Sequence, residues 1–238
     1  MGSPDDEYER RAAEGPQHRV TITQPIYLGV YEVTQAEYER VMDVNPSTHS
    51  HTGEGSASVE SMDTSRFPVE SVSWDEANEF CKKLSSFEEE RVAGRRYWLP
   101  TEAEWEYSCR AGSTTPFHFG DSLSLKQANY PGDRAVEGPS LFRTTTVGSY
   151  PPNAFGLFDM HGNVGEWCQD WYDEEYYAQR VEHDPQGPTS GTHRVLRGGS
   201  YGTYGRTRAA SRDACEPFVW TGCDNGFRVV CAFGVRTS

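Results

Sequence analysis

The sequence predicts one α+β domain, with its helices in the first half of the chain and mostly irregular structure in the second half. Three observations support this prediction: helix-start signals between residues 34 and 104, short apolar runs near both ends that are typical of strands, and a stretch rich in Gly, Pro, Asn and Ser over residues 112–200. A chain of 238 residues is long enough for one large core. No internal repeat is visible, which excludes solenoids and propellers.

Each predicted helix begins with a capping box, in which a Ser or Thr side chain and a Glu three residues later satisfy each other's backbone N–H groups. The boxes are Thr34-x-x-Glu37, Ser73-x-x-Glu76 and Thr101-x-x-Glu104. They predict helices over residues 34–43, 73–90 and 101–111. Behind Ser73, apolar residues recur at the spacing of one buried helix face, so the second helix has the clearest pattern.

Short strands are predicted toward both ends of the chain, over residues 19–23, 26–31, 194–197 and 226–231. Between the two groups, residues 112–200 are interrupted by Gly, Pro, Asn or Ser every few positions, so neither helical nor strand periodicity persists. A loop region of this length in a compact domain is usually functional or is held by something other than helix and sheet, such as a bound ion.

The charge balance excludes several partners. The chain has 22 Lys and Arg against 36 Asp and Glu, a net charge of −14, which repels phosphate backbones and anionic lipid surfaces. We therefore expect neither nucleic-acid nor membrane binding. No apolar run approaches the roughly 20 residues of a membrane span, and residues 1–7 lack the features of a signal peptide, so a cytoplasmic location is the default expectation. The six cysteines include no Cys-x-x-Cys pair, which argues against structural zinc, and most are expected to be buried thiols.

The segment 153–172 resembles the central signature of the formylglycine-generating enzyme, or sulfatase-modifying factor, family. Further blocks of the family follow its order at residues 31–34, 68–74, 99–106, 197–201 and 226–228. The resemblance covers nearly the whole chain and implies the family's fold, an elaborated C-type lectin-like domain over residues 1–238. Residues 1–3 also resemble an early family segment that is preceded there by a strand absent from this sequence.

The resemblance includes two kinds of enzyme whose metal ligands do not match this chain. Family oxidases bind copper(I) through two cysteines near positions 203 and 208, where this sequence has Thr203 and Arg208, so no copper is expected. Cys215 and Cys223 lie later, and an oxidase that used them would need a different loop path. The related iron-dependent sulfoxide synthase takes histidines largely from an added helical domain, which this chain lacks. The histidines here are scattered, and residues 49–58 are interpreted as a mobile polar loop.

The third kind of relative is a non-catalytic binding module, which includes variable proteins diversified by retroelements. Their ligand face corresponds to residues 201–225. Only Glu216 and Trp220 in that segment are of types that such mutagenesis does not produce. Average amino-acid usage would place about five residues of those types in a segment of this length. We therefore predict a ligand-binding module for a protein or other macromolecule, with an ordinary loop and the oxidase as alternatives. The predicted ligand surface consists of Tyr201, Gly202, Thr203, Tyr204, Arg206, Ser211, Asp213, Phe218, Val219 and Trp220.

A structural calcium ion is also implied by the resemblance. Asp159, Gly162, Val164 and Glu166 supply two carboxylates and two carbonyls at the family's spacing, and oxygen donors of this kind suit calcium. The alternative is that the two carboxylates cap backbone amides. A second family site begins at Asn129 and Tyr130, but its remaining ligands between Asp133 and Phe142 do not align clearly.

Two sets of large side chains are expected to be structural. Trp167, Trp171 and Tyr172 are predicted to lie in the core. The second set should bind loop carbonyls and carboxylates beneath the ligand face, because one planar guanidinium can hold several oxygens. It consists of Arg197, Arg208, Arg212 and Arg228.

Overall fold

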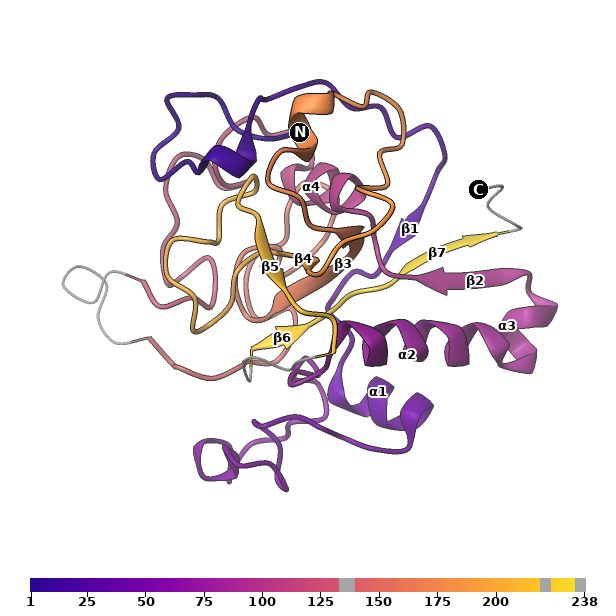
Figure 1. Ribbon diagram of the computed structural model, residues 1–238. Helices are drawn as coiled ribbons and strands as arrows, with labels where there is room; N and C mark the ends of the chain where they lie inside the picture. Colours follow the sequence, from indigo (N-terminus) through magenta and orange to yellow (C-terminus); the bar gives the residue numbers. More distant parts are fainter. Residues whose placement is uncertain (133–139, 219–223, 234–238) are drawn as a thin grey trace.

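The computed structural model describes residues 1–132, 140–218 and 224–233 (Figure 1). Its helices are α1 (Gln35–Met42), α2 (Trp74–Ser86), α3 (Glu88–Val92) and α4 (Glu102–Arg110). Short 3-10 helices span Ala12–Glu14 (η1), Ser56–Ser58 (η2) and Tyr176–Gln179 (η3). All three predicted capping boxes form, at Thr34, Ser73 and Thr101. The helix predicted over 73–90 is interrupted at Phe87, whose ψ of 141° is not helical, so α3 is separate from α2.

The strands form two small sheets. β1 (Tyr27–Leu28), β7 (Val230–Phe233) and β2 (Arg95–Trp98) make an antiparallel sheet in the order β1-β7-β2. The second sheet has the order β5-β4-β3-β6, and its strands are β5 (Asp213–Cys215), β4 (Arg194–Arg197), β3 (Gly165–Trp171) and β6 (Asn225–Gly226). Its pairs are antiparallel except β3 with β6, which run parallel. Figure 1 shows α1 and α2 on one side and α4 near the four-stranded sheet.

The predicted strands are confirmed in part. Residues 194–197 form β4 as predicted, whereas the strand predicted over 26–31 is reduced to β1. The run 226–231 is divided between β6 and β7, and the buried residues Phe227 and Arg228 lie between the two strands. The strand predicted over 19–23 is wrong, since only Thr21 makes a bridge, to His183. Most of the described part of 112–200 is irregular, as predicted.

Three strands, β2, β3 and β5, were not predicted. In β3, Gly165, Glu166, Trp167 and Cys168 are all buried, so the strand lacks the alternation of apolar and polar residues that identifies half-buried strands. β3 lies between β4 and β6 in the sheet.

The apolar core has two parts. The larger contains Tyr38, Phe80 and Phe227, whose rings pack at centroid distances of 5.3 to 6.2 Å, and also the fully buried Trp167. The smaller one lies around Trp105, where Cys109, Met160 and Cys168 are also buried. Trp167 is in the core as predicted, whereas Trp171 and Tyr172 are half-buried and stack on arginines. The thiols of Cys81, Cys109, Cys168 and Cys215 are buried, as expected.

The four predicted structural arginines are buried and bind carboxylates and carbonyls, which confirms that prediction. Arg197 donates to Glu106 at 2.7 Å and to the carbonyls of Ala209 and Ala210 at 2.6 and 3.2 Å. Arg212 forms a two-point pair with Glu102, and Arg228 forms one with Glu166. These contacts connect segments that share no helix or sheet ladder.

Within the described ranges, no helix is both long and apolar enough to cross a lipid bilayer.

Replacing Arg197 by Met should lower the free energy of unfolding by about 3 to 5 kcal/mol, because the change removes one partner of a buried ion pair. Lys83→Ala is the control: the Lys83–Asp43 pair is also close, at 3.0 Å, but it is exposed and should contribute about 1 kcal/mol or less. Urea denaturation of both variants measures the difference, and equal losses would contradict the role assigned to Arg197.

Candidate functional site

A cleft of about 560 Å³ lies beside the segment that follows β4 and its Gly198-Gly199 turn. One side is formed by residues 204–208 and another by the N-terminal segment. Its lining is Tyr8, Glu9, Pro116, Phe117, Asp121, Ser122, Leu123, Tyr130, Gly132, Tyr204, Gly205, Thr207 and Arg208. The cleft therefore combines segments that lie far apart in the sequence.

Arg208 ties two sides of the cleft together. Its guanidinium makes a two-point pair with Glu14 at 2.9 and 2.6 Å, contacts the carboxylate of Glu7, and donates to the Glu9 carbonyl at 2.7 Å. Burial favours the neutral form of Glu14, but hydrogen bonds from Arg208 and Ser3 outweigh it, so the pKa of this carboxyl is lowered. The pair is thus charged and fixes residues 7–14 against the segment around Arg208.

A buried histidine supports the wall at Thr207. The Nδ1 atom of His161 lies 2.6 Å from the Thr207 carbonyl, and its Nε2 accepts a hydrogen bond from the His118 N–H at 3.2 Å. This arrangement requires the neutral ring to carry its proton on Nδ1. Burial lowers the pKa of His161 to about 3, which agrees with a neutral ring at pH 7. His161 is therefore a structural support rather than a proton donor.

The exposed lining of the cleft is aromatic and acidic. Tyr8 is 81% exposed and Tyr204 59%, and Phe117 also contributes. The carboxylates of Glu9 and Asp121 make no hydrogen bond or ion pair with the described residues, whereas both terminal nitrogens of Arg208 pair with Glu7 and Glu14. The charges that remain available to a ligand are therefore negative.

Only some of the residues predicted for the ligand surface are exposed in the structure. Gly202, Tyr204 and Phe218 are exposed, and Thr203, Arg206 and Asp213 are half-buried. Arg206 pairs with Asp213. Val219 and Trp220 lie outside the described residues.

Tyr201 and Ser211 are buried, so placing their side chains on the surface was wrong. The Tyr201 ring packs edge-on against His49 at 5.2 Å, and Ser211 donates its N–H to the Arg208 carbonyl within the tight turn beneath the cleft. His49 is itself buried, and its N–H donates to Glu70 at 2.6 Å. The interpretation of residues 49–58 as a mobile polar loop is therefore wrong at its start.

Among the predicted surface residues that the structure describes, Tyr204 alone lines the cleft. The sequence analysis missed Tyr8, Phe117 and Asp121, and it considered Tyr130 only for calcium. No local pattern identifies these residues, because the contacts that bring them together span most of the chain.

The two positions expected for copper-binding cysteines hold oxygen- and nitrogen-bearing side chains that are already engaged. The Thr203 hydroxyl hydrogen-bonds with the Ser200 hydroxyl at 2.6 Å and with Asp224 at 3.3 Å. Arg208 makes the ion pairs described above. Cys215 is buried in β5, and Cys223 lies outside the described residues.

The predicted calcium loop contains buried acidic groups. Asp159 is buried in a left-handed conformation, and its Oδ2 accepts a hydrogen bond from the Gly148 N–H at 2.6 Å. Its Oδ1 is buried and has no hydrogen-bond partner among the described residues, which is the feature expected of a cation ligand. Burial raises the pKa of Asp159 to about 6. Glu166 instead accepts from Arg228 and Trp105, at 2.6 to 2.8 Å.

A third carboxylate, Glu32, was not predicted here. It accepts from the Asn163 side chain at 2.9 Å and from the Val164 N–H at 3.3 Å. Burial raises its pKa, and the charges of Asp159 and Glu166 raise it further. Glu32 thus lies near Asp159, Glu166 and the guanidinium of Arg228, and a bound divalent cation would favour the ionised form of these carboxylates.

At the second predicted calcium position, Asn129 is hydrogen-bonded to other protein groups. The Asn129 side chain donates to the Arg143 carbonyl at 2.9 Å and to Asn163 at 3.1 Å, and the Asn129 carbonyl accepts from the Asn163 N–H at 2.7 Å. Residues 133–139, which include part of the expected ligand stretch, lie outside the described residues. In the parts that are described, no three His, Cys, Asp or Glu side chains meet as a metal site, so a cation would also need backbone carbonyls.

Comparisons with known proteins agree on one family. The family described as "Sulfatase-modifying factor enzyme 1-like domain" matches residues 1–233. The formylglycine-generating enzyme of Streptomyces coelicolor is 40% identical over 174 residues, which cover 68% of this chain and 51% of that protein. The chain thus spans about half the length of this relative.

Two solved structures share the fold. PvdO from Pseudomonas aeruginosa superposes with a TM-score of 0.77 at 30% identity, covering 97% of this chain and 89% of that one. Treponema denticola variable protein 1 has a TM-score of 0.77 at 26% identity, covering 97% and 91%. These similarities confirm the predicted α+β, C-type lectin-like fold.

Tyr201 and Tyr204 form a matched pair for testing the cleft wall. Tyr204→Ala should change the free energy of unfolding by less than about 0.5 kcal/mol because the side chain is exposed. Tyr201→Ala should cost about 3 kcal/mol or more because it removes a buried ring. Chemical denaturation of both variants measures this contrast, and a large loss for Tyr204→Ala would place that residue in the core.

Proposed function

We propose that this chain, which belongs to the sulfatase-modifying factor enzyme 1-like domain family, is a non-catalytic ligand-binding protein that uses the cleft beside Tyr204. The observation that supports this most strongly is the buried Arg208–Glu14 pair, because the family resemblance would place a copper-binding cysteine near position 208. Copper(I) prefers soft thiolate ligands and is repelled by a guanidinium. Moving Arg208 aside would also leave Glu14 buried and unpaired, which is strongly unfavourable.

The lining of the cleft supports binding of a protein or another macromolecule. Tyrosine gives a large, rigid contact area at small entropic cost, and Tyr8 and Tyr204 are both exposed at the cleft. Glu9 and Asp121 favour a partner surface that carries positive charge. The similarity to a Treponema variable protein supports a role in which residues 201–225 vary while the scaffold stays constant.

The alternative is an oxidase acting on protein cysteine, and it is favoured by the 40% identity to a formylglycine-generating enzyme. The two functions can be separated directly. The protein incubated with copper(I), oxygen and a peptide containing the sulfatase motif should form no aldehyde detectable by mass spectrometry. Turnover that is lost in Cys215→Ala or Cys223→Ala would establish the oxidase instead.

Loss of binding should accompany loss of the cleft aromatics. In a screen against an array of basic and acidic peptides, Tyr204→Ala should bind its best peptide at least about tenfold more weakly than the unmodified protein. Tyr107→Ala is the control, since Tyr107 is similarly exposed, at 57%, but lies outside the cleft. Equal binding by the two variants would contradict the assignment of the cleft.

A structural calcium ion is the second part of the proposal. Asp159 Oδ1 has no protein partner and lies in an acidic, buried region, so Asp159 and Glu166 would hold the ion together with the carbonyls of Gly162 and Val164. The ion would supply positive charge that fixes the loop.

Removing calcium should therefore lower the melting temperature. An ion present at about 100 times its dissociation constant stabilises the folded state by about 2.7 kcal/mol, and a chelator should remove that contribution. In Asp159→Ala the chelator should have no effect. A melting temperature that does not respond to chelator in the unmodified protein, with no calcium by elemental analysis, would exclude the ion.

A further inference from the structure

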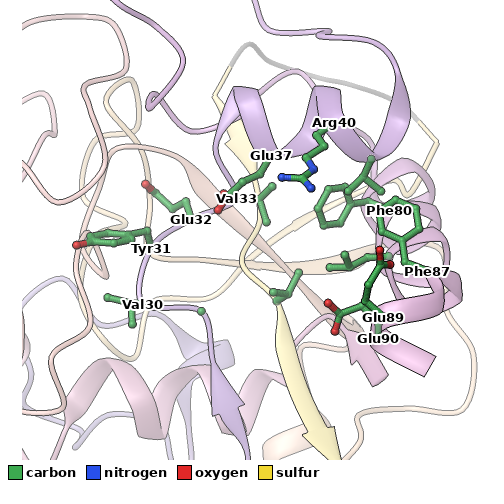
Figure 2. Close-up of a pocket in the computed structure, with 14 residues that line it drawn as sticks. Val30, Tyr31, Glu32, Val33, Glu37, Arg40, Phe80, Phe87, Glu89 and Glu90 are labelled. Carbon is green, nitrogen blue, oxygen red and sulfur yellow. The ribbon is translucent and has the colours of Figure 1, made fainter. Parts of the chain in front are cut away.

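A second cavity, of about 610 Å³, is separate from the cleft and shares none of its lining residues. It lies among α1, α2, α3 and residues 29–33 (Figure 2). Cavities of this volume fall in the range of about 300 to 1,000 Å³ that is typical of small-molecule sites.

The wall of this cavity is largely apolar. Val33, Val41 and Phe80 belong to the buried core and form part of the wall, whereas Leu84 and Phe87 on the helix side are only half-buried. Apolar surface therefore remains accessible along this wall, and a ligand with an apolar body would remove it from water.

Charged groups stand on two sides of the apolar wall. Figure 2 shows Arg40 and Glu37 of α1 on one side and Glu89 and Glu90 of α3 on the other. Glu90 is engaged, because it accepts from Arg95 and from the Tyr97 hydroxyl at 2.5 to 3.1 Å. Glu37 uses one oxygen in the capping box of α1.

Two charged groups have no partner within the described residues: the Glu89 carboxylate and the Arg40 guanidinium. Arg40 lies one helical turn from Glu37 on the exposed side of α1, so the positive charge of Arg40 is offset by a neighbour. Glu89 lies beside Glu90 and has no cation of its own. The charge available to a bound molecule is therefore negative and lies on α3.

We propose that this cavity binds a small amphiphilic cation, with its apolar body against Val33, Phe80 and Leu84 and its positive head group against Glu89. An anionic amphiphile would place its head among four carboxylates, those of Glu32, Glu37, Glu89 and Glu90, and a single guanidinium, and a neutral one would gain only the apolar contact. The proposed contacts include no residue of the cleft and neither Asp159 nor Glu166, so the test is separate from those of the proposed function.

Three probes with the same eight-carbon chain separate the contributions: octylammonium, octanol and octanoate. Each is titrated into protein labelled at Val and Leu methyl groups, and binding is followed by NMR. Octylammonium should bind about three- to fivefold more tightly than octanol at low salt, with octanoate the weakest, and this preference should shrink as salt is added. The methyl signals of Val33, Val41 and Leu84 should shift together.

Glu89→Gln should remove the preference for octylammonium over octanol while leaving octanol binding unchanged. Glu88→Gln is the matched control, because Glu88 is the adjacent exposed residue of α3 but does not line the cavity. Octanoate binding as tightly as octylammonium, equal effects of the two variants, or shifts confined to methyl groups outside the cavity would each overturn the proposal. Absence of saturable octylammonium binding would also overturn it.

Discussion

A buried guanidinium needs carboxylate or carbonyl oxygens as hydrogen-bond partners, and this requirement fixes the loops of the protein. Long segments of the chain belong to no helix or sheet, so backbone hydrogen bonds alone cannot fix them. Arg197, Arg208, Arg212 and Arg228 take over that role by binding carboxylates and loop carbonyls at once. Since an unpaired charge in the interior is strongly unfavourable, each arginine holds its loops in one arrangement.

Arg208 links this structural rule to function. The family resemblance would place a copper ligand near position 208, where Arg208 is instead part of the scaffold, and the cleft beside it keeps its shape through the Glu14 pair and the neutral His161. A cleft with a fixed wall and exposed tyrosines fits the role in recognition that we propose.

The sequence predicted features that depend on neighbouring residues and missed those that depend on distant ones. The capping boxes were predictable because Thr34, Ser73 and Thr101 each act within one turn, and the arginines because one planar guanidinium can hold several oxygens at once. The strand β3 was missed because both of its faces are buried. Tyr201 and Tyr204 are the same residue three positions apart in an irregular segment, so no periodicity shows which one is buried. The opposite wall of the cleft, at Tyr8 and Phe117, depends on contacts across the whole chain.

The central claim is that the Arg208–Glu14 pair holds the cleft in place, and hydrogen exchange of the Glu14→Gln variant tests it most directly. Weakening this pair should speed amide exchange in residues 2–15 and 199–209 while α2 remains as protected as in the unmodified protein, because local opening differs from global unfolding. Asp43→Asn, which changes an exposed ion pair, should leave both segments unaffected. Unchanged exchange in residues 199–209 of Glu14→Gln, or a uniform increase that includes α2, would contradict the account.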